Sequence, residues 1–434
     1  MEEARGASDR VGGVGQTERV TSTTSPPAGA PSGPRFGLKR DLLRPGHSER
    51  SDRVTFIELF FDLIFVFALT QLSRYLSENQ SPLGALESTI LVLALWWVWV
   101  YTTWVTNWLD PAKLPVRGAV IVLALIGLVV STSIYESFGD RGIVFAIAYV
   151  TLQLGRTVFM IVAVARHDAA LTRDFVRVLI WMTAAGAFWI VGALLPLEFR
   201  LAAWIIAIVI EYLSAAIGFR VPGLSSTRVG DWDISGEHIA ERSALFVIIA
   251  IGESFLVTGF SFVAQESSVQ GVIGVLLAFV GGVAMWWLYF DRAESVGANA
   301  IAGSEHPGRL ARVAYTYVHA VIIGGIVLTS VADKELLLHP DDGVSVGVAL
   351  TVAGGPFLYL AGLALFRWVV ARERLVSHLA GLGMLLLCAL VAPLVSTLAL
   401  GVCTTVVLVI VAAWETRRRI ARGEAVADVE AAER

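Results

Sequence analysis

The stretch Thr55-Phe-Ile-Glu-Leu-Phe-Phe-Asp-Leu-Ile-Phe-Val-Phe-Ala-Leu-Thr-Gln71 is apolar enough to enter a bilayer, yet Glu58 and Asp62 lie inside it. On a helix these two carboxylates are four residues apart and share one face. Unpaired carboxylates that face lipid are costly, and such residues almost always turn toward the interior of a bundle. The stretch therefore predicts a membrane-spanning helix whose acidic face is turned toward protein or water.

The composition of the whole chain agrees with a membrane location. Of 434 residues, 56% are hydrophobic and 16% are charged, and the mean hydropathy is +0.70. Soluble domains carry about 25% charged residues. We therefore predict an all-α polytopic membrane protein. The two cysteines, Cys388 and Cys403, lie in apolar runs, so we expect no disulfide framework, no metal site and no cofactor.

Apolar runs of about 20 residues, the length that a bilayer core requires, recur along the chain. They predict about twelve spans, near residues 54–76, 84–108, 115–136, 142–165, 174–196, 199–219, 239–261, 270–291, 309–332, 344–369, 375–394 and 397–416. The last two spans are the least clearly separated, because only Pro393 and the polar step Ser396-Thr397 lie between them.

The basic residues test this count. With twelve spans, 28 of the 33 Lys and Arg residues fall in the two tails and the loops on the same side as the tails. Cytoplasmic loops of membrane proteins carry an excess of Lys and Arg. We therefore expect a multi-pass protein of the cell membrane with both termini in the cytoplasm.

The chain also has a predicted division into halves. Trp96-Trp97-Val-Trp-Val-Tyr101 ends the second span, and the similar Trp286-Trp287-Leu-Tyr-Phe-Asp291 ends the eighth. This likeness predicts two six-helix repeats, an arrangement common in transporters. Residues 1–50 are rich in Gly, Ser, Thr, Pro and Arg and predict a disordered tail. The predicted segments are a tail at 1–50, a first half at 51–220, a cytoplasmic linker at 221–238, a second half at 239–416 and a charged tail at 417–434.

The seventh span is unusually polar. It reads His238-Ile-Ala-Glu-Arg-Ser-Ala-Leu-Phe-Val-Ile-Ile-Ala-Ile-Gly-Glu-Ser254, and His238, Arg242 and Glu253 share one side of a helix. Glu253 lies ~21 Å from the inner end, past the middle of a ~30 Å core. We interpret His238, Glu241 and Arg242 as anchors at the membrane boundary, and Glu253 as a candidate functional carboxylate.

Four further polar residues, Asp62, Arg156, Glu211 and His319, lie ~12–15 Å from the inner ends of their spans. We therefore expect them to meet at one level, with Asp62 or Glu58 in salt-bridge range of Arg156 or His319. Two alternatives stay open: the acidic pair can be a packing clamp, and His319 can be a buried histidine bonded to a nearby carbonyl.

Three motifs carry a resemblance to a known family. Glu58-Leu-Phe-Phe-Asp-Leu-Ile-Phe-Val-Phe-Ala68, the His238–Ser254 motif and Tyr289-Phe-Asp-Arg292 resemble signatures of the bacterial low-temperature-requirement A family. The resemblance covers residues from about 50 to 415. It implies a multi-pass bacterial membrane protein, named for a growth phenotype in the cold, and assigns no reaction.

A fainter likeness concerns Phe60-Phe61-Asp62, which stands where the lysosomal potassium-channel family has a Phe-Ser-Asp triplet. Subunits of that family carry two six-helix repeats. This sequence departs from the triplet at Phe61 and has no such triplet in the seventh span, so the likeness does not carry over a pore.

The leading functional interpretation is a secondary transporter of a small solute or ion, using intramembrane carboxylates. The alternatives are a cation channel, or a non-transporting membrane factor or intramembrane enzyme needed for growth in the cold. No convincing nucleophile or metal group is present, so we do not predict an enzyme. The expected partners are the bilayer and the solute or ion, with no nucleic acid, and a homo-oligomer is left open.

The residues predicted to bind substrate or couple ions are Glu58, Asp62, Arg156, Glu253 and His319, supported by Glu211, His238, Glu241, Arg242 and Ser254.

Overall fold

The computed structural model describes residues 41–44, 53–224, 235–266, 268–293, 304, 307–373 and 375–421. Within these residues the chain forms helices and no β-strand. The helices are α1 (Phe56–Glu78), α2 (Pro82–Trp108), α3 (Leu114–Ser133), α4 (Gly142–Val164), α5 (Ala169–Ala193), α6 (Leu197–Ala216), α7 (Gly236–Val263), α8 (Val269–Leu288), η2 (Tyr289–Ala293), α10 (Pro307–Ala311), η3 (Arg312–Val318), α11 (His319–Leu338), α12 (Val346–Val352), α13 (Gly354–Ala371), α14 (Val376–Val391), η4 (Ala392–Leu394) and α15 (Thr397–Ala421).

These helices confirm the polytopic all-α prediction. Eleven helical segments of the described chain are long and apolar enough to cross a membrane. The predicted ninth span, 309–332, corresponds to the continuous run of α10, η3 and α11, from Pro307 to Leu338. The end of this run carries Asp333-Lys334-Glu335, which makes it more polar than the other eleven. The total agrees with about twelve spans.

Local capping explains where several helices begin. Ser81 accepts a hydrogen bond from the Gly84 amide of α2, and Asp168 accepts from the Ala170 and Leu171 amides of α5. Ser235 accepts a bond from the His238 amide at the start of α7. A side-chain acceptor at this position satisfies amides that have no partner within the helix. The start of α7 is thereby fixed one turn before its polar motif.

Part of the predicted N-terminal tail is held in place by the helices. Leu43 forms an isolated β-bridge with Leu109, and Leu42 is buried. The Arg44 amide donates to the carbonyl of Trp108 at 2.8 Å. The segment 41–44 is therefore pinned to the end of α2. The remaining tail calls (1–40, 45–50 and 422–434) and most of the predicted linker (225–234) lie outside the described residues.

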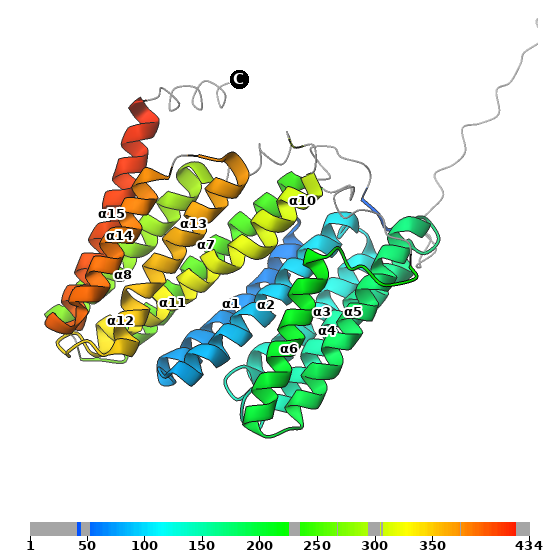
Figure 1. The fold of residues 1–434 in the computed structure, drawn as a ribbon, viewed down its shortest axis with the longest axis horizontal. Coiled ribbons are helices and arrows are strands. Elements are labelled where there is room, and N and C mark those ends of the chain that lie inside the picture. Colours follow the sequence, from blue (N-terminus) through cyan, green and yellow to red (C-terminus); the bar gives the residue numbers. More distant parts are fainter. Residues whose placement is uncertain are drawn as a thin grey trace, which may run out of the picture. The chain divides into compact units, whose positions relative to one another are not determined.

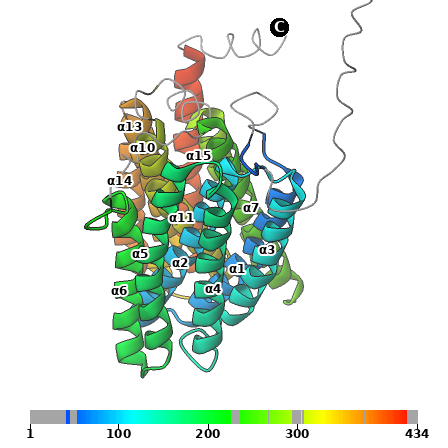
Figure 2. The same ribbon diagram turned by 90° about the vertical axis from the view of Figure 1, so that its right-hand side faces the viewer.

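The two predicted halves have a similar order of neighbours. In the first, α1 packs on α2 and α3, and α3, α4, α5 and α6 pack in succession. In the second, α7 packs on α8 and α11, and α11, α13, α14 and α15 pack in succession. Figures 1 and 2 show these helices running alongside one another. An internal repeat itself stays a prediction.

Four helices bring the halves together. α1 contacts α7 and α11, and α2 contacts α7, α11 and α6. The core between them includes Phe65, Trp96, Trp99 and Phe246, each no more than 3% exposed. The predicted polar residues of α1 and α7 thus face each other across this junction.

α11 and α13 approach closely because glycines line their contact. A Cβ atom added to Gly325 would lie 2.4 Å from the backbone nitrogen of Tyr359 and 2.7 Å from its Cα. No real Cβ contact is this short, so glycine is required here for the two backbones to meet. The neighbouring Gly324 is different, because a Cβ there would lie 3.5 Å from the nearest atom, Cδ2 of Leu358.

We therefore expect Gly325→Ala to destabilise the protein by about 1–3 kcal/mol, the usual cost of overpacking a core. Gly324→Ala is the matched control and should leave stability unchanged or slightly raised, because alanine favours helix more than glycine does. Thermal unfolding of the purified variants in detergent measures the difference. Equal stability of the two variants would contradict the close approach of α11 and α13.

Candidate functional site

The acidic face of α1 is paired with basic residues of α7. Arg242 donates from Nη1 to Oε1 of Glu58 at 3.1 Å and from Nη2 to Oδ1 of Asp62 at 2.5 Å. His238 Nε2 lies 2.9 Å from the same Glu58 oxygen. All four side chains have zero exposure. We call Glu58, Asp62, His238 and Arg242 the α1–α7 ion network.

The protonation of His238 follows from its neighbours. Asn107 is fixed in orientation, since its Nδ2 donates to the Ser235 carbonyl at 2.8 Å and its Oδ1 accepts from the Ser235 amide at 3.0 Å. Nδ2 of Asn107 also lies 3.2 Å from Nδ1 of His238. Because an amide NH₂ group can only donate, Nδ1 accepts and the proton is on Nε2. In this neutral tautomer the Nε2–H group of His238 donates to Oε1 of Glu58, and Nη2 of Arg44 lies 3.0 Å from the same ring nitrogen.

Further groups close the network. Arg44 Nη2 lies 3.4 Å from Oε2 of Glu58, and Trp99 Nε1 donates to Oδ1 of Asp62 at 2.7 Å. Glu241 accepts a hydrogen bond from the Val54 amide at 3.0 Å. Because His238 is neutral, the negative charges of Glu58 and Asp62 are balanced by the guanidinium groups of Arg44 and Arg242. A buried charge with a partner avoids much of the penalty that an unpaired one carries.

The expected pairing of the acidic face with Arg156 or His319 was wrong. Arg242 occupies that position, although the sequence pattern had placed it at the membrane boundary. Asp62, Arg156 and His319 lie in three separate clusters, each with partners of its own. Equal depth along different helices did not bring these residues together.

Arg156 and Glu211 belong to a hydrogen-bonded chain in the first half. Arg156 donates to Oε1 of Gln153 at 2.5 Å and to the Val98 carbonyl at 3.0 Å. Gln153 Nε2 donates to the hydroxyl of Tyr149 at 3.3 Å, and that hydroxyl donates to Oε2 of Glu211 at 2.9 Å. The chain connects α2, α4 and α6, so its clearest effect is to hold these helices together.

His319 matches the alternative of a satisfied buried histidine. Its Nδ1 lies 2.8 Å from the carbonyl of Ala314, so Nδ1 donates and Nε2 accepts. The hydroxyl of Tyr289 lies 2.8 Å from Nε2, and the ring of Tyr315 stacks on the imidazole with centroids 4.7 Å apart. Both ring nitrogens therefore have partners within the protein.

Glu253 has a different environment from the other carboxylates. It is 1% exposed and lies beyond the middle of α7. The charged group that acts on it is another carboxylate, Asp333 of α11, which is 5% exposed. Ser254, next to Glu253, donates to Oδ2 of Asp333 at 2.7 Å. Within the described residues, neither carboxylate forms an ion pair with Arg, Lys or His.

Hydroxyl groups surround this acidic pair. Thr70 and Ser73 of α1 and Ser330 of α11 face the carboxyl group of Glu253. In the described part of the chain, Oε1 of Glu253, Oγ of Ser73 and Oγ of Ser330 are buried without a hydrogen bond of normal geometry. Asp333, Ser73 and Ser330 were not among the site residues predicted from the sequence. Asp333 follows Ser330 by three residues, a spacing that places both side chains on one face of a helix and was the available signal for a polar site there.

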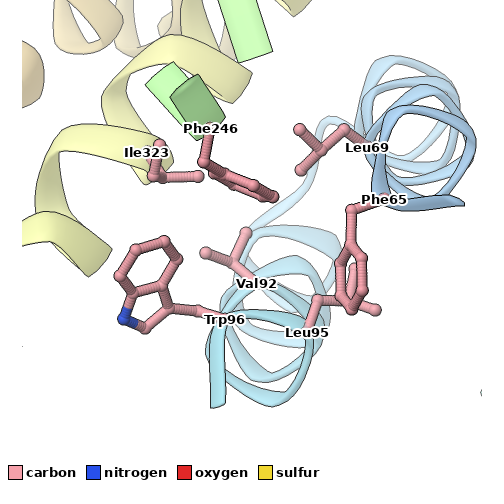
Figure 3. A pocket seen from close by; sticks show the side chains of 7 residues that line it. All are labelled: Phe65, Leu69, Val92, Leu95, Trp96, Phe246 and Ile323. Carbon is pink, nitrogen blue, oxygen red and sulfur yellow. The ribbon is translucent and has the colours of Figure 1, made fainter. Parts of the chain in front are cut away.

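An apolar layer separates the two polar centres. Along α1 and α7 the α1–α7 ion network comes first and the Glu253–Asp333 pair comes about three turns later. Between them is an apolar cavity of about 10 Å³, shown in Figure 3, lined by Phe65, Leu69, Val92, Leu95, Trp96, Phe246 and Ile323. The volume is at the lower limit for one water molecule, and a cavity lined only by apolar side chains stays dry. Within the described residues, the side chains that line this cavity therefore place an apolar layer between the two centres.

A wider cavity lies elsewhere, between α2, α6, α11, α12 and α13. Its volume is about 930 Å³, and Leu93, Tyr212, Tyr317, Val321 and Phe357 are among its lining residues. No Asp, Glu, Lys, Arg or His is part of this lining. The cavity therefore offers no charged group for coupling and is separate from Glu253.

The fold and these centres define a class: a multi-pass helical membrane protein with ionisable groups buried between its helices. The model of the bacterial low temperature requirement A protein (LtrA) family matches residues 53–413. The chain belongs to this family, as its motifs indicated.

A curated relative supports the same conclusion. The chain is 38% identical over 364 residues to an uncharacterized protein of Rhizobium meliloti (strain 1021), covering 84% of this chain and 89% of the relative. No solved structure matches the chain.

Proposed function

We propose that this protein is a secondary transporter of a small solute or ion, and that Glu253 is its coupling group. The observation that supports the proposal is the uncompensated burial of Glu253, which is 1% exposed and has no basic partner among the described residues. Ionisable residues inside membrane helices are expensive, and they commonly mark ion or proton pathways. Glu253 must therefore hold a proton or another cation when it is enclosed, and can exchange it when water reaches it.

The α1–α7 ion network has another role in this proposal. Its carboxylates are matched by guanidinium groups, so it has no need of an exchangeable cation. We assign Glu58 and Asp62 to a clamp that holds α1 against α7, with His238 and Arg242 as its basic side. Arg156 and Glu211 hold the first half together in a similar way, and His319 supports the second half.

The apolar layer between the centres supports alternating access. A transporter must keep its coupling site closed to one side of the membrane while it opens to the other. Phe65 and Phe246, with ring centroids 6.2 Å apart, form such a barrier between the ion network and Glu253. From the distribution of basic residues, we propose that the ion network and both termini lie on the cytoplasmic side of the cell membrane.

Reconstitution of the purified full-length protein into liposomes tests the proposal. We expect uptake of at least one solute or ion from a defined panel, driven above its own gradient by an imposed proton or sodium gradient. Passive ion currents without coupling would instead support a channel. Fluxes equal to those of protein-free liposomes across the panel would argue for a non-transporting membrane factor.

A further inference from the structure

We propose that Glu253 and Asp333, together with the hydroxyls of Ser73, Ser254 and Ser330, form a site for a small monovalent cation, with Na⁺ as its expected ligand. This inference rests on the proposed transport function, because it names the ion that the coupling group takes. The site joins three helices, α1, α7 and α11, that come from both halves of the chain.

The two buried carboxyl groups of the site require a compensating positive charge. Glu253 and Asp333 are 1% and 5% exposed. Within the described residues, Glu253 has Asp333 and hydroxyl groups around it, Asp333 has the hydroxyl of Ser254, and neither has a basic side chain. Two buried carboxylates that share one site cannot both stay charged without a compensating cation. The α1–α7 ion network shows the contrast, since Arg242 supplies the positive charge there.

Independently of charge, several oxygen atoms of the site lack hydrogen bonds of normal geometry in the described part of the chain. Ser73 and Ser330 are 2% and 0% exposed, and their hydroxyls face the carboxyl group of Glu253. Among the described residues these two hydroxyls and Oε1 of Glu253 lack a hydrogen bond of normal geometry. Buried polar groups in proteins are nearly always satisfied, so three such oxygen atoms around one carboxyl group indicate a bound ligand that oxygen atoms can coordinate.

The hydroxyl of Ser254 offers a further oxygen ligand. Its proton is committed to Oδ2 of Asp333 at 2.7 Å. The lone pairs of Ser254 Oγ are therefore available to a cation, while the second oxygen of Asp333 can coordinate the same ion. The donors gathered here are carboxylate and hydroxyl oxygens, which hard cations prefer.

The donor set also limits which cation fits. Transition metals prefer imidazole or thiolate ligands, and no group of three or more His, Cys, Asp or Glu placed to hold a metal occurs among the described residues. Mg²⁺ dehydrates reluctantly and usually keeps several of its waters, which disfavours it at a site whose ligand residues are 0–5% exposed. A divalent ion between two desolvated carboxylates would also be released slowly, whereas transport requires a site weak enough to empty. A monovalent cation meets both conditions, and the site is neutral when one of the two carboxyl groups keeps its proton.

The test is ligand-dependent stabilisation of the purified full-length protein in detergent. NaCl is titrated against choline chloride at constant ionic strength, with KCl and CaCl₂ in parallel. We expect a saturable rise in Tm with Na⁺, because an ion that binds only the folded state stabilises it. K⁺ should give a much smaller rise. Asp333→Asn and Ser330→Ala should weaken the apparent affinity for Na⁺ about tenfold or more, the scale on which metal sites respond to the loss of supporting groups.

Glu87→Gln is the matched control. Glu87 is also a buried carboxylate, but it accepts a hydrogen bond from Tyr75 at 2.5 Å, which glutamine can still accept. This variant should respond to Na⁺ as the wild type does. Ser330→Ala removes only one hydroxyl, so it reports on the site even if Asp333→Asn fails to fold.

The outcomes separate this inference from the transport function. Stabilisation that follows pH but not Na⁺, with transport intact, would mean that the site takes only protons and would overturn the Na⁺ assignment. Stabilisation by Ca²⁺ but not Na⁺ would overturn the monovalent assignment. Saturable Na⁺ binding in a protein that transports nothing would support the site and contradict the transporter.

Discussion

Replacing Arg242 by glutamine is expected to destabilise the protein by about 3–5 kcal/mol, since it leaves buried carboxylates without their shared partner. Arg242 contacts Glu58 at 3.1 Å and Asp62 at 2.5 Å, and all three side chains have zero exposure. Much of this loss of stability is the cost of leaving the two carboxylates buried without a partner, and not the net stabilisation that the ion pair itself provides. Unfolding in detergent and the yield of folded protein both measure the effect.

A surface ion pair provides the control. Arg74 pairs with Glu78 at 3.0 Å, but the two side chains are 56% and 39% exposed. Exposed pairs of this kind contribute about 1 kcal/mol or less, so Arg74→Gln should change stability little. If Arg242→Gln and Arg74→Gln are equally stable, the α1–α7 ion network is not the clamp that its geometry indicates.

A double-mutant cycle separates direct pairing from general damage. Asp62→Asn combined with Arg242→Gln should lose less stability than the sum of the two single changes, with a coupling of about 0.5–3 kcal/mol. Asp62→Asn combined with Arg156→Gln should be additive, because Arg156 bonds to Gln153 and Val98 and not to Asp62. Additivity in both cycles would contradict the pairing of Asp62 with Arg242.

The helices were predictable because a bilayer imposes a minimum apolar length. α4 was expected at 142–165 and runs from Gly142 to Val164, and α7 was expected at 239–261 and runs from Gly236 to Val263. The prediction for α11 stopped at residue 332, because the charges of Asp333-Lys334-Glu335 are typical of a loop. The helix continues since the buried Asp333 packs against α7, a contact that hydropathy along one segment does not contain.

The pairing of side chains was harder to predict for a geometric reason. Distance along a helix gives the height of a residue in the membrane, but not the direction in which it points around the helix axis or the identity of the neighbouring helix. Equal height therefore suggested that Asp62 would meet Arg156, whereas they belong to different clusters. One usable signal was present: acids at 58 and 62 on α1 and basic residues at 238 and 242 on α7 have the same spacing of four. Matching these two patterns would have predicted the ion network.

Glu253→Gln is expected to give a folded protein whose coupled transport falls to the level of protein-free liposomes. Glutamine keeps the shape of glutamate and can bond to Ser73, Ser330 and Thr70, which face this position. It has no titratable charge, so it can neither release a proton nor attract a cation. Because Glu253 has no ion-pair partner in the described chain, its neutralisation leaves no opposite charge unpaired. Stability should therefore be retained or raised while coupling is lost.

This combination distinguishes a coupling group from a structural one. A structural carboxylate such as Glu87, which accepts a bond from Tyr75, should tolerate Glu87→Gln with transport intact. Unfolding curves and flux, measured on the same preparations, separate stability from activity in both variants. If Glu253→Gln transports at the wild-type rate and still responds to the driving gradient, Glu253 is not the coupling group. The ion network would then become the next place to look for exchangeable charge, although its carboxylates are already matched by Arg44 and Arg242.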